Sequence, residues 1–137
     1  MDKEYVITGN KLIAEFMGGK YNNTLRFRIA QNDIWLPKYG ICRYDTIEPG
    51  KGKILEYHKS WDWLMTCVEK ITSIPLLDNA NECNYIYIGF DYEDNSHYVN
   101  LYHGEDAQIN GNSKTSKIEA VYEACIKFIE WYNNEKS

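Results

Sequence analysis

The sequence predicts an α+β fold, a layered sandwich in which three helices pack against a mostly antiparallel sheet of four to six strands. Three observations predict it. Apolar residues recur at helical spacing in three segments, and shorter segments between them alternate apolar and polar residues as strands do. Aromatic residues make up 15% of the chain, which favours packed sheet faces. A length of 137 residues further predicts a single domain spanning 1–137.

In the first part of the chain we expect one helix and several short strands. The helix should cover residues 8–17, with Thr8 or Asn10 as its N-cap and two glycines as its stop. Residues 25–29 alternate cleanly, which predicts a strand with one apolar and one basic face. The other short segments with strand character are residues 34–36, 41–47 and 54–57.

The remaining chain predicts two more helices and a hairpin. Ser60 is a good N-cap for a helix from 61 to about 74, which Pro75 closes. Residues 85–92 and 97–103 predict a β-hairpin, followed by a hydrophilic loop over 104–113. Ser116 followed by Glu119 is a capping-box pattern, so the last helix should start there.

That last helix, over residues 116–132, is apolar around more than half of its circumference. Its polar strip contains Glu123 and Lys127, which are spaced to form an ion pair one turn apart. A helix of this kind is either covered on two sides by its own chain or used in a homo-oligomer. We expect the first arrangement.

Charge and cysteine content narrow the function classes. The net charge of −5 combines +4 over residues 20–59 with −8 from residue 60 onward, so binding of nucleic acid by the whole surface is not expected. The N-terminus lacks a hydrophobic export signal and no apolar run is long enough to span a membrane. The four scattered cysteines are therefore expected to be reduced thiols in the cytoplasm.

Three stretches of the chain together resemble the phage ABA sandwich domain, a family of small proteins of bacteriophages and prophages. They are the motif NKLIAEFMG at 10–18, the tryptophan-led YHKSWDWLM at 57–65 with VEKI at 68–71, and the alanine-rich SKIEAVYEAC at 116–125. The resemblance implies a layered α/β sandwich in the cytoplasm of an infected or lysogenic bacterial cell. The family has no assigned activity, so the resemblance implies no catalytic residue and no cofactor.

No residue pattern predicts catalysis or a metal site. His97 and His103 share strand parity but stand too far apart along a strand to chelate one ion together. The acidic residues 91–94 lack the spacing of a calcium loop, and a solvated turn is the simpler interpretation. His58 stands near Ser60, but no third residue is placed to orient the pair as a base and nucleophile.

One local basic face is the candidate binding site. Arg26 and Arg28 should share one strand face, and Arg43 joins them if its segment is a neighbour in the sheet. Guanidinium groups suit phosphate or carboxylate, and aromatic rings would add stacking surface for a base. The predicted ligand-binding residues are Arg26, Arg28, Arg43, Trp35 and Tyr44, with Lys51 and Lys53 on a nearby turn. The simpler alternative is a solvated face whose arginines pair with Asp45 or Glu56.

The sequence therefore favours a non-enzymatic phage accessory protein that binds a host or phage component. An anionic partner would bind at the basic face. The alternative is a small enzyme or a sequestering protein that acts on a nucleotide signal. No cofactor, metal ion or membrane is predicted to take part.

Overall fold

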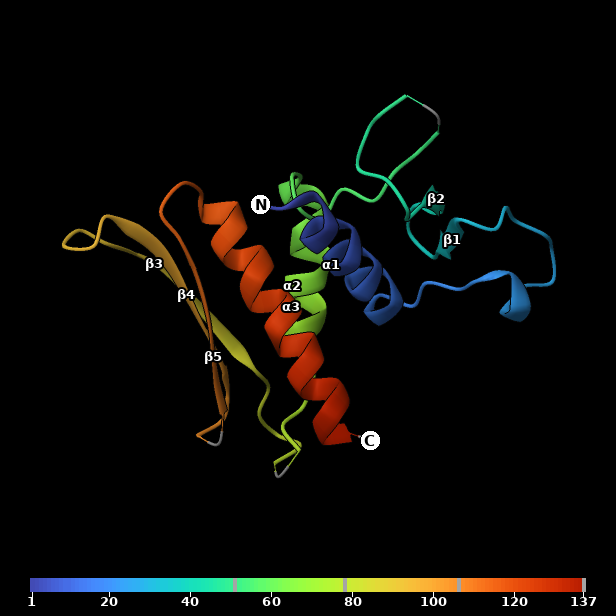
Figure 1. Ribbon diagram of the computed structural model, residues 1–137. Helices are drawn as coiled ribbons and strands as arrows, with labels where there is room; N and C mark the ends of the chain where they lie inside the picture. The colour runs from blue at the N-terminus through green and yellow to red at the C-terminus, as the bar shows by residue number, and fades with distance from the viewer. Residues whose placement is uncertain (51, 78, 106, 137) are drawn as a thin grey trace. The chain divides into compact units, whose positions relative to one another are not determined.

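The computed structural model describes residues 1–50, 52–77, 79–105 and 107–136, and the chain forms two compact units, Met1–Tyr57 and His58–Ser137 (Figure 1). Over the described residues it has three α-helices and two antiparallel sheets, which confirms the α+β prediction. The expectation of one sheet of at least four strands is wrong, because the strands form a two-stranded and a three-stranded sheet. The single domain stays a prediction.

The first unit begins with helix α1 (Lys3–Phe16), which starts five residues before the predicted position. Asp2 takes the N-cap position and Glu4 lies in the first turn, where the helix dipole favours a negative charge. Asn10, a predicted cap, instead lies buried within the helix and donates a hydrogen bond to the carbonyl of Leu55 at 3.3 Å. The helix ends as predicted, at a glycine in the left-handed conformation, Gly18.

Residues 25–29 do not form the predicted strand. After a short 3₁₀ turn, η1 (Asn22–Thr24), the side-chain amide of Asn22 holds both backbone polar groups of Ile29. Its Oδ1 accepts from the Ile29 N–H at 2.6 Å, and its Nδ2 donates to the Ile29 carbonyl. Because these two bonds replace those of a strand partner, the segment closes into a loop.

A hairpin follows, made of β1 (Asp33–Leu36) and β2 (Gly40–Arg43). The pairing sets Trp35 opposite Ile41 and Leu36 opposite Gly40, whose φ of +78° suits the turn that a glycine can make. The predicted strand at 54–57 is absent from the described residues. Its residues Ile54, Leu55 and Tyr57 are buried, and Ile54 makes one isolated bridge with Arg43.

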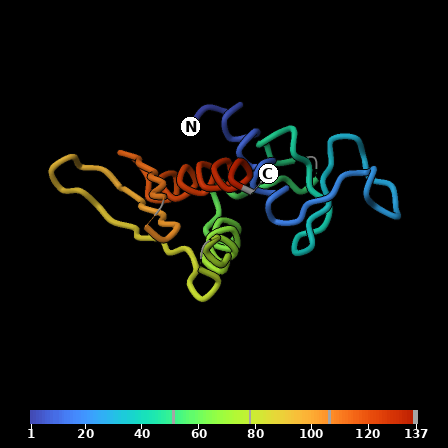
Figure 2. The backbone as a smooth tube through the Cα atoms, turned by 90° about the horizontal axis from the view of Figure 1, so that it is seen from below, coloured from blue at the N-terminus to red at the C-terminus, as the bar shows by residue number. Residues whose placement is uncertain are grey.

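The second unit contains α2 (Trp61–Ser73), the strands β3 (Tyr85–Asp91), β4 (Ser96–His103) and β5 (Ala107–Ser113), and α3 (Lys117–Lys136). The sheet order β3-β4-β5 is that of an antiparallel meander. Ser60 caps α2 as predicted, since its hydroxyl accepts from the Trp63 N–H. The predicted hairpin is present as β3 and β4, and its turn extends beyond the N-terminal end of α3 (Figure 2).

The region predicted as a hydrophilic loop contains β5, so that prediction is wrong over residues 107–113. This strand carries mostly polar side chains, and its backbone is organised by a full register of pairs with β4. Gly111 faces α3, and a Cβ added there would lie 2.1 Å from the carbonyl oxygen of Ala120. The absence of a side chain at this position is therefore what lets helix and sheet approach so closely.

Helix α3 lies along β4 and β5 on one side and contacts α2 on another. The apolar residues of its predicted arc are buried from Ala120 to Ile129 and half-buried at both ends, and Tyr122, Phe128 and Ile129 are fully enclosed. The ammonium of Lys127 meets the carboxylate of Glu123 at 2.8 Å, as the spacing predicted. Among the described residues, no helix combines the length and apolar character that crossing a bilayer requires.

Two buried polar residues fix the sheet to the end of α2. The amide of Asn84 donates to the carbonyl of Ile71 at 2.9 Å, and its Oδ1 lies 2.6 Å from Nδ1 of His103. Nε2 of His103 accepts from the Leu77 N–H at 3.2 Å, so the proton of this ring sits on Nδ1 and is donated to Asn84. His103 therefore has a structural role, and His97 lies six residues away on the same strand.

Candidate functional site

The predicted basic face is not assembled by a sheet. Arg26 and Arg28 are exposed on the loop that Asn22 closes, and within the described part of the chain they have no strand partner, because β1 pairs with β2 instead. Two residues apart on a loop, they need not share a face as they would on a strand. The premise that placed them beside Arg43 is therefore wrong.

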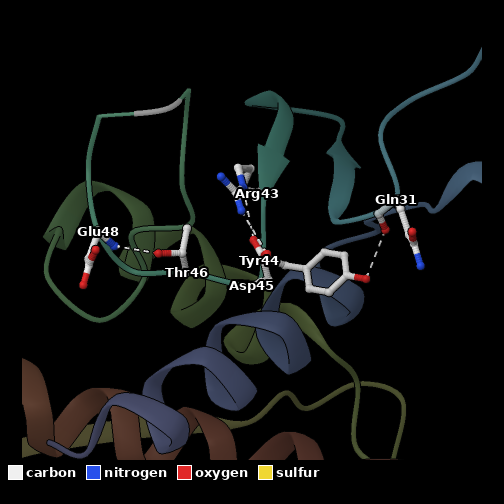
Figure 3. A network of polar contacts seen from close by, with 6 residues as sticks. All are labelled: Gln31, Arg43, Tyr44, Asp45, Thr46 and Glu48. Carbon is white, nitrogen blue, oxygen red and sulfur yellow. Dashed lines mark hydrogen bonds and ion pairs between the residues drawn. The ribbon is translucent and has the colours of Figure 1, made fainter.

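Arg43 lies on β2 and is already paired (Figure 3). Its Nε and Nη2 donate to the two carboxylate oxygens of Asp45 at 3.1 and 2.9 Å, a bidentate contact. The Arg43 guanidinium holds the pKa of Asp45 below its usual range. This contact is the one that the simpler alternative predicted, and a ligand anion would have to compete with Asp45 for the same donors.

The two aromatic residues predicted to stack on a base also have protein partners. The hydroxyl of Tyr44 donates to the carbonyl of Gln31 at 3.3 Å (Figure 3), and the ammonium of Lys11 lies 4.9 Å from its ring centroid. The ring of Tyr21 meets it edge-on. Trp35 is half-buried in β1, where its backbone pairs with Lys20 and Ile41.

A hollow of about 380 Å³ does lie beside Arg43, and Lys53 and Asp33 line it as well. Arg26, Arg28, Trp35 and Tyr44 do not line it. The ammonium of Lys53 donates to the carbonyl of Tyr39 at 2.8 Å, so both cations at this hollow hold a protein group. Lys51 lies outside the described residues.

The three-stranded sheet presents a second surface, on the side away from α3. Strand alternation puts every second residue there, and the register aligns the three strands into rows. We call this surface the tyrosine–amide face. Its rows, read from β3 across β4 to β5, are Tyr85, Tyr102 and Gln108, then Tyr87, Asn100 and Asn110, then Gly89, Tyr98 and Asn112.

The tyrosines of this face are paired and open to solvent. Tyr85 stacks on Tyr102 with ring centroids 4.7 Å apart, and Tyr87 stacks on Tyr98 at 5.9 Å. Tyr85 and Tyr87 are nevertheless 56% and 55% exposed. A hydrogen bond with Tyr87 raises the pKa of Tyr98. Stacking thus fixes the rings while leaving large parts of them accessible.

Gly89 makes room for one of these rings. A Cβ added at this position would lie 2.5 Å from the ring and hydroxyl of Tyr98, so the ring lies directly over the glycine backbone. The tyrosine–amide face therefore has a defined shape, set by a gap in β3 that the Tyr98 ring fills.

Amides occupy most of the positions between and beside the tyrosines. Nε2 of Gln108 donates to Oδ1 of Asn110 at 3.0 Å. The side chains of Asn100 and Asn112 make no hydrogen bond with any described residue, and Asn112 is exposed. Unpaired amides on an open surface offer donors and acceptors to a ligand.

The face deepens over β4 and β5 into a hollow of about 680 Å³. Tyr98, Asn100, Asn110 and Asn112 line its floor, and the β3–β4 turn at 91–94 lines one end. Asp91 stabilises that turn, because its Oδ1 accepts hydrogen bonds from the backbone N–H groups of Glu93 and Asp94. The remaining acidic groups of the turn face solvent.

The sequence predicted the tyrosines of this face but not the β5 amides beside them. Alternation along residues 85–91 and 96–103 correctly separates the tyrosines from the apolar residues. The amides of β5 became neighbours of the tyrosines only through a strand that the sequence did not predict. Among the described residues, no group of three or more His, Cys, Asp or Glu side chains is placed so that it could hold a metal ion.

Comparison with protein-family models, with curated proteins and with solved structures finds no match for this chain. The resemblance to the phage ABA sandwich domain thus stays a prediction.

Proposed function

We propose that this protein is a non-enzymatic binding module of a phage or prophage, and that it engages a host or phage component through the tyrosine–amide face. The observation that carries the proposal is the set of four tyrosines held in stacked pairs on an exposed sheet surface. The phage setting rests on the three sequence motifs described above, and the cytoplasm of the infected or lysogenic cell is the location it implies.

Ordering side chains on binding costs conformational entropy. Tyrosine and tryptophan provide large, amphipathic contact areas with only two rotatable bonds, so little conformational entropy is lost when they bind a partner. Stacking has already restricted the four rings before any partner arrives. A preorganised surface keeps more of its interaction energy as affinity.

The alternative, a small enzyme or a sequestering protein for a nucleotide signal, would use the hollow beside Arg43. A nucleotide phosphate entering there meets a guanidinium already bound to Asp45 and an ammonium already bound to the Tyr39 carbonyl. It also meets the carboxylate of Asp33. The competition favours the sheet face as the binding surface, although an anionic partner at Arg26 and Arg28 remains a separate, testable hypothesis.

Parallel affinity capture from infected or lysogenic cells separates these surfaces. The baits are the unaltered protein, a Tyr85→Ser, Tyr87→Ser variant, and an Arg26→Ala, Arg28→Ala variant as the matched control. All four positions are exposed, so both variants should keep their fold, which circular dichroism checks. We expect the captured component to be lost from the tyrosine variant and kept by the arginine variant. The opposite pattern would place the contact on the basic residues.

A further inference from the structure

We propose that the component recognised by the tyrosine–amide face is a neutral oligosaccharide. The inference rests on the proposed binding function and adds the chemical class of the ligand. It follows from four properties of the face: its dimensions, its aromatic walls, its amide groups and its charge.

The dimensions suit a short sugar chain. Strands lie about 4.8 Å apart and alternate residues on one strand about 6.8 Å apart, so a grid of three by three positions measures about 10 by 14 Å between its outer corners. The grid has nine positions, well below the roughly 20–30 residues that each partner contributes to a typical stable protein interface. It is sufficient for a few linked sugar rings lying across the strands.

The tyrosines form walls around an amide. Asn100 lies between Tyr98 and Tyr102 on the same face of β4, with Asn110 directly beside it on β5. A sugar ring placed over Asn100 would have an aromatic ring on two sides. The C–H bonds on the flat side of a pyranose carry a partial positive charge, and the electron-rich face of a tyrosine ring attracts them.

The amides match the hydroxyl groups of a sugar. Each sugar hydroxyl both donates and accepts hydrogen bonds, and a side-chain amide provides two donors and a carbonyl acceptor in one plane. The side chains of Asn100 and Asn112 make no hydrogen bond with the described residues, and they line the hollow of about 680 Å³. They are free to bind neighbouring hydroxyls without breaking a protein contact.

The charge disfavours a nucleic acid, which is the other common ligand of an aromatic sheet face. The chain from residue 58 onward has six lysines against thirteen acidic residues, a net charge of −7. The nine positions of the face carry no charged side chain. Asp91, the next residue of β3 on the same side, and the carboxylates of the turn line one end of the hollow. The nearby ammonium of Lys127 is held by Glu123 and by the carbonyl of Asn110. A phosphate backbone would find repulsion where it needs cations.

The experiment is to titrate the full chain with maltohexaose, cellohexaose and N-acetylchitohexaose in turn. Calorimetry measures the affinity, and changes in the backbone amide chemical shifts locate the binding site. We expect at least one to bind with Kd below about 1 mM. Its affinity should hardly change with added salt, because no ion pair is formed. The shift changes should map to residues 85–91, 96–102 and 108–112.

Three variants test the site itself. Tyr98→Ala and Asn100→Ala should each weaken binding of that sugar by about tenfold or more, the usual cost of removing a central contact. Gly89→Ala keeps every binding residue but pushes the Tyr98 ring away, so it should weaken binding as well. Glu130→Gln, at an exposed position of α3 on the other side of the sheet, is the control that should change nothing.

The outcomes are distinguishable. The proposal is overturned if none of the three sugars binds at about 10 mM, or if they bind equally well to the three face variants. It is also overturned if a twelve-nucleotide single-stranded DNA binds instead with a steep salt dependence. If no sugar binds but the tyrosine variant still loses its captured component, the ligand class is wrong and the binding function stands. If that variant also captures normally, both proposals fail.

Discussion

At the scale of single residues, several side chains bond polar groups that a strand partner or a ligand would otherwise bond. Asn22 takes the place of a strand partner for Ile29, and Asp45 occupies the donors of Arg43. Each of these contacts satisfies a polar group that a ligand would otherwise find available. The candidate basic site was therefore weakened by contacts two to seven residues apart, which alternation patterns do not reveal.

The thiols give a prediction at this scale. Cys42, Cys67 and Cys125 are buried and Cys83 is exposed, and all four are free. Burial raises the pKa of Cys42 to about 11, and that of Cys125 is raised by its contact with Cys67 as well as by burial. At pH 8 about one Cys42 thiol in a thousand would be the reactive thiolate.

We therefore expect iodoacetamide at pH 8 to label one thiol in the native protein, Cys83, and four in denaturant without reductant. Mass spectrometry of the intact chain counts the labels, and peptide mapping identifies the site. Cys83→Ser is the control and should leave the native protein unlabelled. Fewer than four labels in denaturant would show that a disulfide is present.

At the scale of elements, the start of α3 shows how a local sequence pattern becomes structure. The Ser116 hydroxyl accepts from the Glu119 N–H, as the capping-box pattern predicts. The hydroxyls of Ser113 and Thr115 both donate to Oε2 of Glu119, at 2.9 and 3.0 Å. The hydrogen bond from Ser113, followed by that from Thr115, holds the pKa of Glu119 below its usual range.

A lowered pKa means that the ionised form stabilises the fold. This stability is fully present above the pKa of an unfolded glutamate, about 4.3, and is lost as the pH falls through the lower folded value. Glu119→Gln should therefore destabilise the protein at pH 7, by less than about 1 kcal/mol because the carboxylate is largely solvated. Urea melts at pH 7 and pH 3 should show the difference from the unaltered protein shrinking in acid. A difference that grows in acid would contradict the assignment, and Glu130→Gln, an exposed position on the same helix, is the control.

The elements also show why the sequence predicted some parts of the fold and not others. α2 was predicted to within a residue, because Ser60 and Pro75 mark both of its ends. β5 was missed because neither face of an AQINGNS segment is hydrophobic, and its strand geometry comes from pairing with β4. The tyrosine–amide face depends on that pairing, so the alternation pattern alone predicted its tyrosines but not its β5 amides. Residues 25–29 show the reverse case, since good alternation was overridden by the amide of Asn22.

At the scale of the whole molecule, one measurement tests whether the two compact units unfold together, as a single domain would. Ile129 is fully buried in α3. Ile129→Ala should lower the free energy of unfolding by about 2–5 kcal/mol, the usual cost of such a truncation in a packed core. If the chain is one cooperative domain, a single transition should be seen throughout.

Denaturant melts followed by far-ultraviolet circular dichroism and by tryptophan fluorescence check both points. Trp35 is the one tryptophan within Met1–Tyr57, so fluorescence of a Trp61→Phe, Trp63→Phe, Trp131→Phe variant reports on that unit. Ile129→Ala introduced into that variant should shift the Trp35 signal together with the circular dichroism. A loss below about 1 kcal/mol would mean that Ile129 is not in a packed core, and a Trp35 signal that does not move would mean that the units unfold independently.

The contact between Gly111 and α3 limits which mutations the codon of this residue can tolerate. Any single-base change in the first two positions of a glycine codon yields a stop or an amino acid with a Cβ, and no Cβ fits beside the Ala120 carbonyl. Codon 111 can therefore drift only silently, whatever the protein binds. Under the proposed binding function, the codons of Asn110 and Asn112 on either side are constrained mainly by the ligand, so a lineage that abandons the ligand would lose these asparagines and still keep the glycine between them.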